Sequence, residues 1–202
     1  MKVVLASKNP HKLTEIAAIL KPLQIELVLE SELGVDIEVE ETGTTFEENS
    51  FLKANAVMQA TGLPALADDS GIAVDALGGA PGVYSARYGG DPSLDDWGRL
   101  LLLLKNMEQV PDGQRQAQFV SVITMVYPDG HVIQARGEAH GELLREAVGS
   151  GGFGYDPIFY FPPAGKSFAE LTAEEKNRVS HRANALHLFY QKLCEERNYA
   201  DQ

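Results

Sequence analysis

The chain contains one cysteine, Cys194, among its 202 residues. One cysteine cannot form an internal disulfide, and a lone cysteine in a predicted C-terminal helix is more often a packing residue than a nucleophile. The five histidines show no spacing typical of metal ligands, either with Cys194 or with one another. Neither cysteine chemistry nor a zinc site is therefore expected.

Long apolar runs are also missing from the chain. No run is longer than that from Leu100 to Leu104, far below the ~18 residues that a membrane span needs. The start from Met1 to Ala6 is too short for a secretory signal. We therefore expect a cytoplasmic protein that has no membrane partner.

Basic residues are few: 17 Lys and Arg stand against 29 Asp and Glu, which gives a net charge of −12. Such a balance disfavours attraction to a nucleic-acid backbone, so no nucleic-acid partner is expected. A small polyanion is still compatible, because a few basic groups, a helix N-terminus and a divalent cation on carboxylates can form a local positive site. Any phosphate site should thus be compact and metal-assisted.

The length fits one domain at ~150 residues per domain, and the sequence has no internal repeat or clear linker. Strand and helix patterns alternate, which predicts an α/β protein with a mixed central sheet flanked by helices. We expect one two-lobed domain over residues 1–202. Apolar patterns predict strands at 2–6, 25–29, 64–67, 72–76 and 157–161, a hairpin of 116–127 with 131–142, and helices from Pro10, from Thr45 to about 61, from Asp91 to about 106 and from about Thr172.

The first candidate site is the pattern Ser7-x-Asn9-x-x-Lys12, where the first strand leads into a helix. Free N–H groups at the helix start, a hydroxyl, an amide and an ammonium can together hold phosphate oxygens. The Walker A glycines are absent, so a P-loop is excluded. The ordinary alternative is a capped helix with a solvated lysine.

Acidic residues form a second candidate site: Glu38, Glu40, Glu41, Asp68 and Asp69. Carboxylates from two segments suit Mg²⁺, which bridges one or two of them to substrate phosphates. For the segment around Glu40 the ordinary alternative is a solvated acidic face. In the predicted turn 68–71 two adjacent carboxylates follow an apolar strand and repel one another unless a cation compensates, which favours a function.

Two further sets lie toward the C-terminus. The glycine-rich stretch 151–157 combines mobile backbone with Phe153 and Tyr155, whose rings offer flat faces to a purine, and with Asp156, which can accept hydrogen bonds from ring N–H groups. A structural loop with core aromatics is the alternative. The other set joins Lys176 to the run 180–182, in which an arginine is suited to planar recognition.

Six motifs resemble the inosine triphosphate pyrophosphatase family, and in particular its bacterial branch. The resemblance runs in order from residue 2 to about residue 195. The motifs are Ser7-Lys8-Asn9-Pro10-His11-Lys12, Thr45-Phe46-x-Glu48-Asn49 with Lys53, Ala67-Asp68-Asp69-Ser70-Gly71, Leu77 to Gly82 with Ser85-Ala86-Arg87-Tyr88, Gly152-Phe153-Gly154-Tyr155-Asp156-Pro157 and Ser180-His181-Arg182.

The resemblance implies an enzyme that cleaves ITP, dITP and XTP to the monophosphate and pyrophosphate and so removes them from the nucleotide pool. It also implies two lobes with a central active-site cleft, dependence on Mg²⁺ and a homodimer. By motif position, Ser7, Lys8, Asn9, Pro10, His11, Lys12 and Lys53 would bind the triphosphate, and Ser70, Phe153, Gly154, Tyr155, Asp156, Lys176, His181 and Arg182 would complete the nucleotide pocket. Glu40 and Asp69 would bind the metal, with Asp69 activating water; because Glu40 and Glu41 are adjacent, the metal assignment could shift by one residue.

Two other functions stay open from the sequence. One is a nucleotide-binding or regulatory protein that keeps the pocket without turnover. The other is a general nucleoside triphosphatase that releases orthophosphate. Detection of pyrophosphate after incubation with dITP distinguishes all three.

Overall fold

The computed structural model describes residues 1–7 and 10–200. The strands are β1 (Lys2–Leu5), β2 (Glu26–Leu29), β3 (Ala65–Val74), β4 (Gln116–Val126), β5 (Val132–Leu143), β6 (Phe159–Phe161) and β7 (Lys166–Ser167). The helices are α1 (Pro10–Leu20), α2 (Phe46–Thr61), α3 (Asp96–Asn106), α4 (Ala173–Val179) and α5 (His181–Ala200). No helix in these two ranges is long and apolar enough to cross a membrane.

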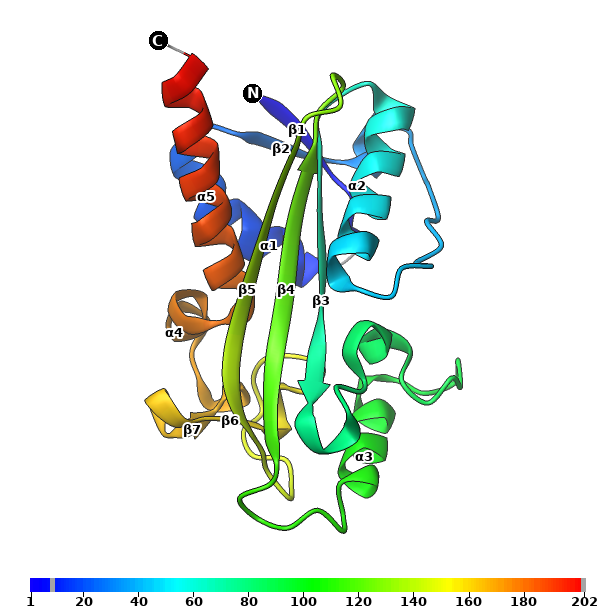
Figure 1. Cartoon of the computed structure of the whole chain (residues 1–202), viewed down its shortest axis with the longest axis vertical. Coiled ribbons are helices and arrows are strands. Elements are labelled where there is room, and N and C mark those ends of the chain that lie inside the picture. The colour runs from blue at the N-terminus through cyan, green and yellow to red at the C-terminus, as the bar shows by residue number, and fades with distance from the viewer. Residues whose placement is uncertain (8–9, 201–202) are drawn as a thin grey trace. The chain divides into compact units, whose positions relative to one another are not determined.

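The strands form one sheet in the order β2-β1-β3-β4-β5-β6-β7 (Figure 1). Strand β1 pairs in parallel with β2 and β3, whereas β6 pairs antiparallel with β5 and β7. The predicted α/β class with a mixed sheet is therefore confirmed.

The chain divides into two compact units. Unit 1 comprises residues 1–69, 121–137 and 182–202, and unit 2 comprises 70–120 and 138–181. Strands β3, β4 and β5 each contribute residues to both. The central cleft expected from the resemblance stays a prediction.

In unit 1 helices cover both faces of the sheet. Alternate residues of a strand point to opposite faces, and the core follows this rule. Leu5 and Leu66 pack with α1 and α5, whereas Val4 and Ala65 pack with α2. Figure 1 shows α1 and α5 on one side of the strands and α2 on the other.

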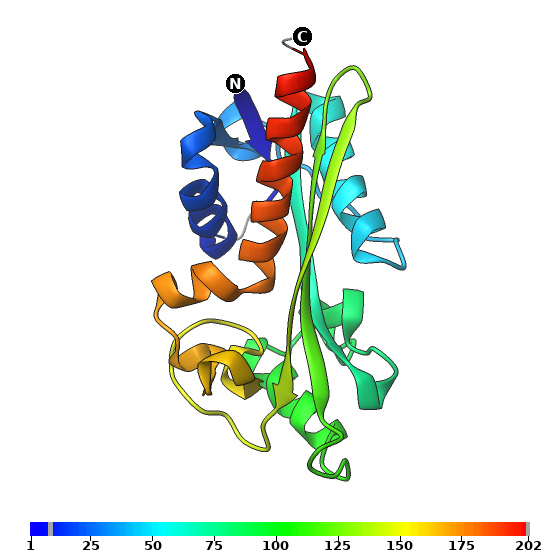
Figure 2. The ribbon, with the colours of Figure 1, turned by 60° about the vertical axis from the view of Figure 1, so that its left-hand side comes forward.

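Helix α5 also lies beside the β4–β5 hairpin, although the two are far apart in sequence (Figure 2). The ammonium of Lys192 donates a hydrogen bond to the carbonyl of Gln134 at 2.6 Å, and His131 lies 3.0 Å from Glu196. These contacts tie the last helix to the end of the hairpin.

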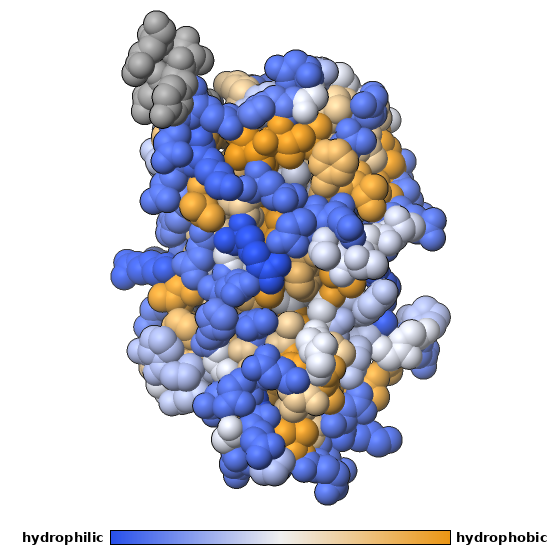
Figure 3. Space-filling model, viewed as in Figure 1, coloured by the Kyte–Doolittle hydropathy of each residue, from blue (hydrophilic) through white to orange (hydrophobic). Residues whose placement is uncertain are grey.

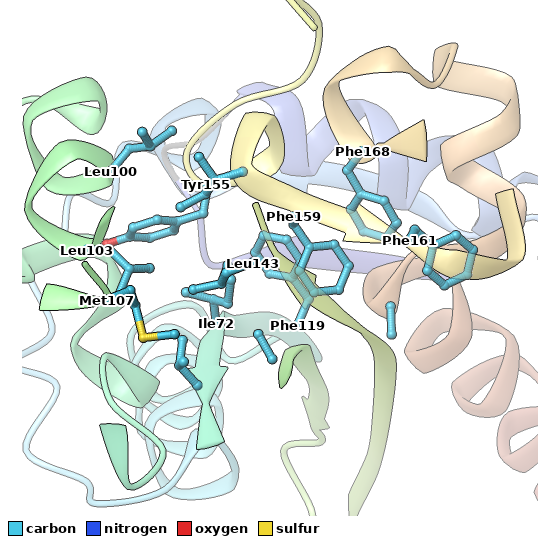
Figure 4. Packing of buried hydrophobic residues seen from close by; sticks show 14 residues of the cluster. Ile72, Leu100, Leu103, Met107, Phe119, Leu143, Tyr155, Phe159, Phe161 and Phe168 are labelled. Atoms are coloured by element: carbon cyan, nitrogen blue, oxygen red, sulfur yellow. The ribbon is translucent and has the colours of Figure 1, made fainter. Parts of the chain in front are cut away.

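Unit 2 has its own core, drawn in Figure 4. Aromatic rings dominate it: Phe119 packs on Phe159 at 4.7 Å between centroids and lies parallel to Phe168 at 5.7 Å. The hydroxyl of Tyr155 donates to the carbonyl of Ser85 at 2.8 Å. Burial raises the pKa of this hydroxyl, so it stays protonated and keeps its hydrogen bond.

The structure corrects the prediction of two strands, 64–67 and 72–76, joined by a turn. Residues 65–74 form one continuous strand, β3, so Asp68 and Asp69 lie within a strand and not at its end. Cationic groups meet both carboxylates, as described below, so the acids do not need a solvent-exposed turn. Gly71 lies within this strand, where a side chain would collide with Ser85 and with the carbonyl of Gly82.

Two helices also differ from the prediction. Helix α3 begins at Asp96 and not near Asp91, because the Asp91 carboxylate accepts hydrogen bonds from Ser93 in a turn, while Asp95 caps the helix. The C-terminal helix is two helices, since the extended backbone of Ser180 separates α4 from α5. The predicted hairpin, the helix start at Pro10 and the capping box of Thr45 with Glu48 are confirmed.

Candidate active site

Side chains alternate along strand β3, so the adjacent residues Asp68 and Asp69 point to opposite faces of the unit 1 sheet. Leu66 and Asp68 point to the face covered by α1 and α5, and Ala67 and Asp69 point to the face covered by α2. Each carboxylate therefore meets a different helix layer. We call the group formed by Lys12, Glu41, Lys53, Asp68, Asp69, Ser121 and Arg182 the aspartate cluster.

Asp68 is fully enclosed and surrounded by donors. Its Oδ2 atom lies 2.6 Å from the ammonium of Lys12 in α1 and 3.4 Å from the guanidinium of Arg182 in α5. Its Oδ1 atom accepts a hydrogen bond from Ser121 at 2.5 Å. A buried carboxylate is stable only when it is paired in this way.

Asp69 shares a cation with a second acid. The ammonium of Lys53 donates to Asp69 Oδ1 at 2.6 Å and to Glu41 Oε1 at 2.8 Å. The Oδ2 atom of Asp69 is buried and has no hydrogen-bond partner within residues 1–7 and 10–200. The two neighbouring aspartates thus differ, because within the described residues Asp69 has a carboxylate oxygen without a hydrogen-bond partner.

Local hydrogen bonds bring Glu41 to this position. The segment that follows it is fastened to the first turn of α2: Glu48 accepts from the backbone N–H groups of Thr44 and Thr45, and Asn49 accepts from the N–H of Gly43 at 2.8 Å. A side chain at Gly43 would collide with Glu48 and Asn49. The cap of α2 therefore holds the segment that follows Glu41 close to the helix that contains Lys53.

The pKa values of the two aspartates move in opposite directions. Burial alone would raise the pKa of Asp68, but Arg182, Lys12 and the bond from Ser121 outweigh it and hold that pKa well below its ordinary value. Burial raises the pKa of Asp69, and the charge of Glu41 adds to this effect while Lys53 opposes it.

The lysines of the cluster also differ from each other. Burial lowers the pKa of Lys12, against the attraction of Asp68. Burial would lower the pKa of Lys53 too, but Asp69 and Glu41 outweigh it, and the pKa is raised. Lys53 is therefore held firmly in its charged form between the two carboxylates.

The carboxylates of Glu41 and Asp69 fit a divalent cation. They already converge on one positive charge, the ammonium of Lys53, at 2.8 and 2.6 Å. The described part of the chain contains no group of three or more His, Cys, Asp or Glu side chains placed to hold a metal. Two carboxylates suit Mg²⁺, which takes its other ligands from water and substrate phosphates.

A second cluster lies in unit 2, around Asp156. The Oδ2 atom of this buried carboxylate accepts from the ammonium of Lys176 at 2.6 Å and from the N–H of Phe153 at 2.8 Å. The Lys176 ammonium lies 4.5 Å from the centroid of the Phe153 ring. Gly152 has a positive φ of 70°, and a side chain there would collide with Asp156. The glycine-rich loop is thus built around this ion pair.

The other predicted pocket residues of unit 2 are placed as follows. His181 is buried and stacks on Phe119 at 4.7 Å. Gly154 has a positive φ of 59°, and Ser70 is half-buried on β3. Tyr155 belongs to the aromatic core, so its ring is packed rather than exposed. Their roles toward a nucleotide stay predictions.

The structure also places the predicted residues of unit 1. Lys12, Lys53, Asp69 and Arg182 lie together in the aspartate cluster. Glu40 is exposed, and its neighbour Glu41 is the acid that reaches Lys53. Ser7 is half-buried after β1. Lys8 and Asn9 lie outside the described residues, as do the side chains of Pro10 and His11.

Sequence reasoning missed Ser121, which donates to Asp68 from the middle of β4. Its signal was present: a polar residue between Val120 and Val122 in a buried strand needs a partner. It also missed Phe119 as the partner of His181, because nothing in the local pattern of either residue indicates the other.

The mixed sheet and the aspartate cluster define an α/β protein with lysines and carboxylates gathered at one buried site. The Ham1 family profile matches residues 3–192, and the chain belongs to this family. The resemblance drawn from the motifs is confirmed.

Three relatives extend this match over nearly the whole chain. A dITP/XTP pyrophosphatase of Pectobacterium atrosepticum is 52% identical over 194 residues, which are 95% of this chain and 98% of that protein. A HAM1 protein from Coxiella burnetii is 42% identical with a TM-score of 0.90, covering 96% of this chain and 99% of its own. The Staphylococcus aureus Ham1 protein is 41% identical with a TM-score of 0.88, and the match covers 97% of this chain and 100% of that protein.

The low pKa of Asp68 predicts a specific loss of stability in acid. The ionised carboxylate stabilises the fold above the unfolded pKa of about 3.9, and this contribution disappears as the pH falls through the lower folded pKa. Between the two values one group contributes a slope of about 1.4 kcal/mol per pH unit. We expect Asp68→Asn to lack this slope when urea unfolding is measured against pH. Parallel curves for the variant and the unmodified chain below about pH 4 would contradict the assignment.

Proposed function

We propose that the chain hydrolyses ITP, dITP and XTP to the nucleoside monophosphate and pyrophosphate, and so removes them from the nucleotide pool. The observation that carries the chemistry is the open Oδ2 atom of Asp69, buried beside a lysine and a second carboxylate. The choice of substrate rests on the relatives named dITP/XTP pyrophosphatase that are about half identical to this chain.

The residues of the aspartate cluster have separable tasks in this reaction. Lys12 and Lys53 bind the triphosphate, together with the predicted phosphate residues of the 7–11 segment. Asp69 orients a water molecule and accepts its proton at Oδ2. The water oxygen then bonds to the α-phosphorus, the bond to the bridging oxygen breaks, and pyrophosphate leaves with its charge balanced by the lysines.

A bound Mg²⁺ would neutralise phosphate charge and polarise the phosphoryl oxygens. Asp69 would hold it together with Glu41 or Glu40. The placement of Glu41 on Lys53 favours Glu41, and the exposure of Glu40 makes it the weaker candidate.

The Asp156 cluster supports recognition of the purine. Phe153 offers a ring face to the base, and Asp156 and His181 of the same unit supply polar groups. The 6-oxo group of hypoxanthine and xanthine is an acceptor where adenine carries a donor. A buried protein donor that meets another donor loses about 1–3 kcal/mol, so a polar pocket discriminates strongly between these bases.

We also propose a homodimer in the cytoplasm. Trp97 and Leu101, one turn apart on α3, are 52% and 47% exposed, and a partner surface would cover them. Hydrophobic patches are visible among hydrophilic residues in Figure 3. Sedimentation velocity distinguishes a dimer from a monomer. The cytoplasmic location is proposed because the enzyme needs access to the nucleotide pool.

The proposed reaction predicts stoichiometric pyrophosphate from ITP and dITP, and little from ATP. We expect Asp69→Asn to lower kcat by about 10³-fold or more because the proton acceptor is lost. Pyrophosphate and orthophosphate are measured separately after incubation with each nucleotide and Mg²⁺.

Asp75→Asn is the matched control, since Asp75 is an exposed acid outside both clusters. It should keep the full rate. Orthophosphate as the first product would indicate a general triphosphatase, and nucleotide binding without any product would indicate a regulatory protein. Near-normal turnover by Asp69→Asn would remove Asp69 from the mechanism.

The adjacent glutamates provide a test of the metal site. We expect Glu41→Gln to raise the dissociation constant for Mn²⁺ by about tenfold or more, because one of two carboxylate ligands is lost. Glu40→Gln should leave it nearly unchanged. Binding is followed by electron paramagnetic resonance of free Mn²⁺ without nucleotide, and the reverse order of effects would assign the ligand to Glu40.

A further inference from the structure

Asp68 holds two cationic groups on a single oxygen atom. The ammonium of Lys12 and the guanidinium of Arg182 both contact Oδ2, at 2.6 and 3.4 Å. Lys12 lies in α1 and Arg182 lies in α5, so the carboxylate links these two helices. Neither the metal site nor the water-activating step uses this residue.

The exposure of the three side chains is graded. The side chain of Asp68 is 0% exposed and that of Arg182 is 1% exposed, whereas that of Lys12 is 17% exposed. Lys12 is therefore the member of the group that a dissolved ligand can reach. The carboxylate of Asp68 and the guanidinium of Arg182 are more deeply buried than Lys12. They determine where the Lys12 ammonium lies and the electrostatic potential that acts on it.

Electrostatics explain why the carboxylate is required for this arrangement. Two cations held close together in a buried site repel each other strongly because the surrounding dielectric constant is low. The charge of Arg182 does oppose the charged form of Lys12. Asp68 compensates this repulsion, and without it the long lysine side chain would turn toward solvent.

We propose that Asp68 is a positioning residue that fixes the Lys12 ammonium for binding the pyrophosphate part of the substrate, so that phosphate affinity depends on Asp68 only through Lys12. This role rests on the proposed function, because it takes Lys12 as a phosphate-binding group. Asp68 itself touches no phosphate, since like charges repel.

A double-mutant cycle on inorganic pyrophosphate tests this role without turnover. The proteins are the unmodified chain, Asp68→Asn, Lys12→Met and the double variant, each titrated with pyrophosphate and Mg²⁺ by calorimetry. We expect Asp68→Asn alone to weaken binding by about tenfold or more, and by about twofold or less when Lys12 is already replaced.

Thr124→Val is the control for general destabilisation. Thr124 is a buried polar residue on β4 that hydrogen-bonds Ser50 and Gln134, so its replacement also breaks buried hydrogen bonds, but outside the aspartate cluster. It should lower the unfolding midpoint and leave pyrophosphate affinity nearly unchanged. A merely structural Asp68 would behave in the same way as this control.

The outcomes separate clearly. An equal loss of affinity from Asp68→Asn in both backgrounds, or a loss no greater than that of Thr124→Val, overturns the proposal. If Asp68→Asn does not fold, the same cycle is run with Asp68→Glu, which keeps the charge but displaces it by one methylene, and additivity again overturns it. If the cycle shows that Asp68 and Lys12 are coupled in pyrophosphate binding while the chain releases no pyrophosphate from ITP, that result supports the positioning role and contradicts the proposed function.

Discussion

Two adjacent carboxylates in a buried strand impose the main constraint on this protein. A buried ionised group must be paired, and a strand sends neighbouring side chains to opposite faces. Asp68 and Asp69 therefore need separate sets of cations, one from each helix layer of unit 1. Lys12 and Arg182 form ion pairs with Asp68, and Lys53 forms one with Asp69.

The helices of unit 1 are organised to meet this requirement. Helices α1 and α5 pack on one core face and bring their cations to Asp68. Helix α2 packs on the other face, and its capped N-terminus also fixes the acidic segment that carries Glu41. The same packing that buries the core thus gives the two aspartates different surroundings: Asp68 is paired on both oxygens, and Asp69 has one oxygen without a partner in the part of the chain that the structure describes.

Much of this architecture follows from local patterns. The hairpin, the start of α1 and the capping box of α2 were predictable because their signals lie within a few residues. The turn assigned to 68–71 was wrong because the groups that neutralise Asp68 are distant in sequence, Arg182 being 114 residues away. The choice between Glu40 and Glu41 was open for a similar reason, since adjacent acids have the same pattern and only the packing against Lys53 distinguishes them.

The central claim is that the two neighbouring aspartates are electrostatically opposite. It is tested most directly by carbon-13 NMR of their carboxyl carbons during a pH titration of the metal-free protein, with Asp68→Asn and Asp69→Asn used for assignment. The account predicts a pKa for Asp68 well below the ordinary value and a pKa for Asp69 above it. Two carboxyl groups that titrate together near the ordinary value of about 3.9 would contradict it.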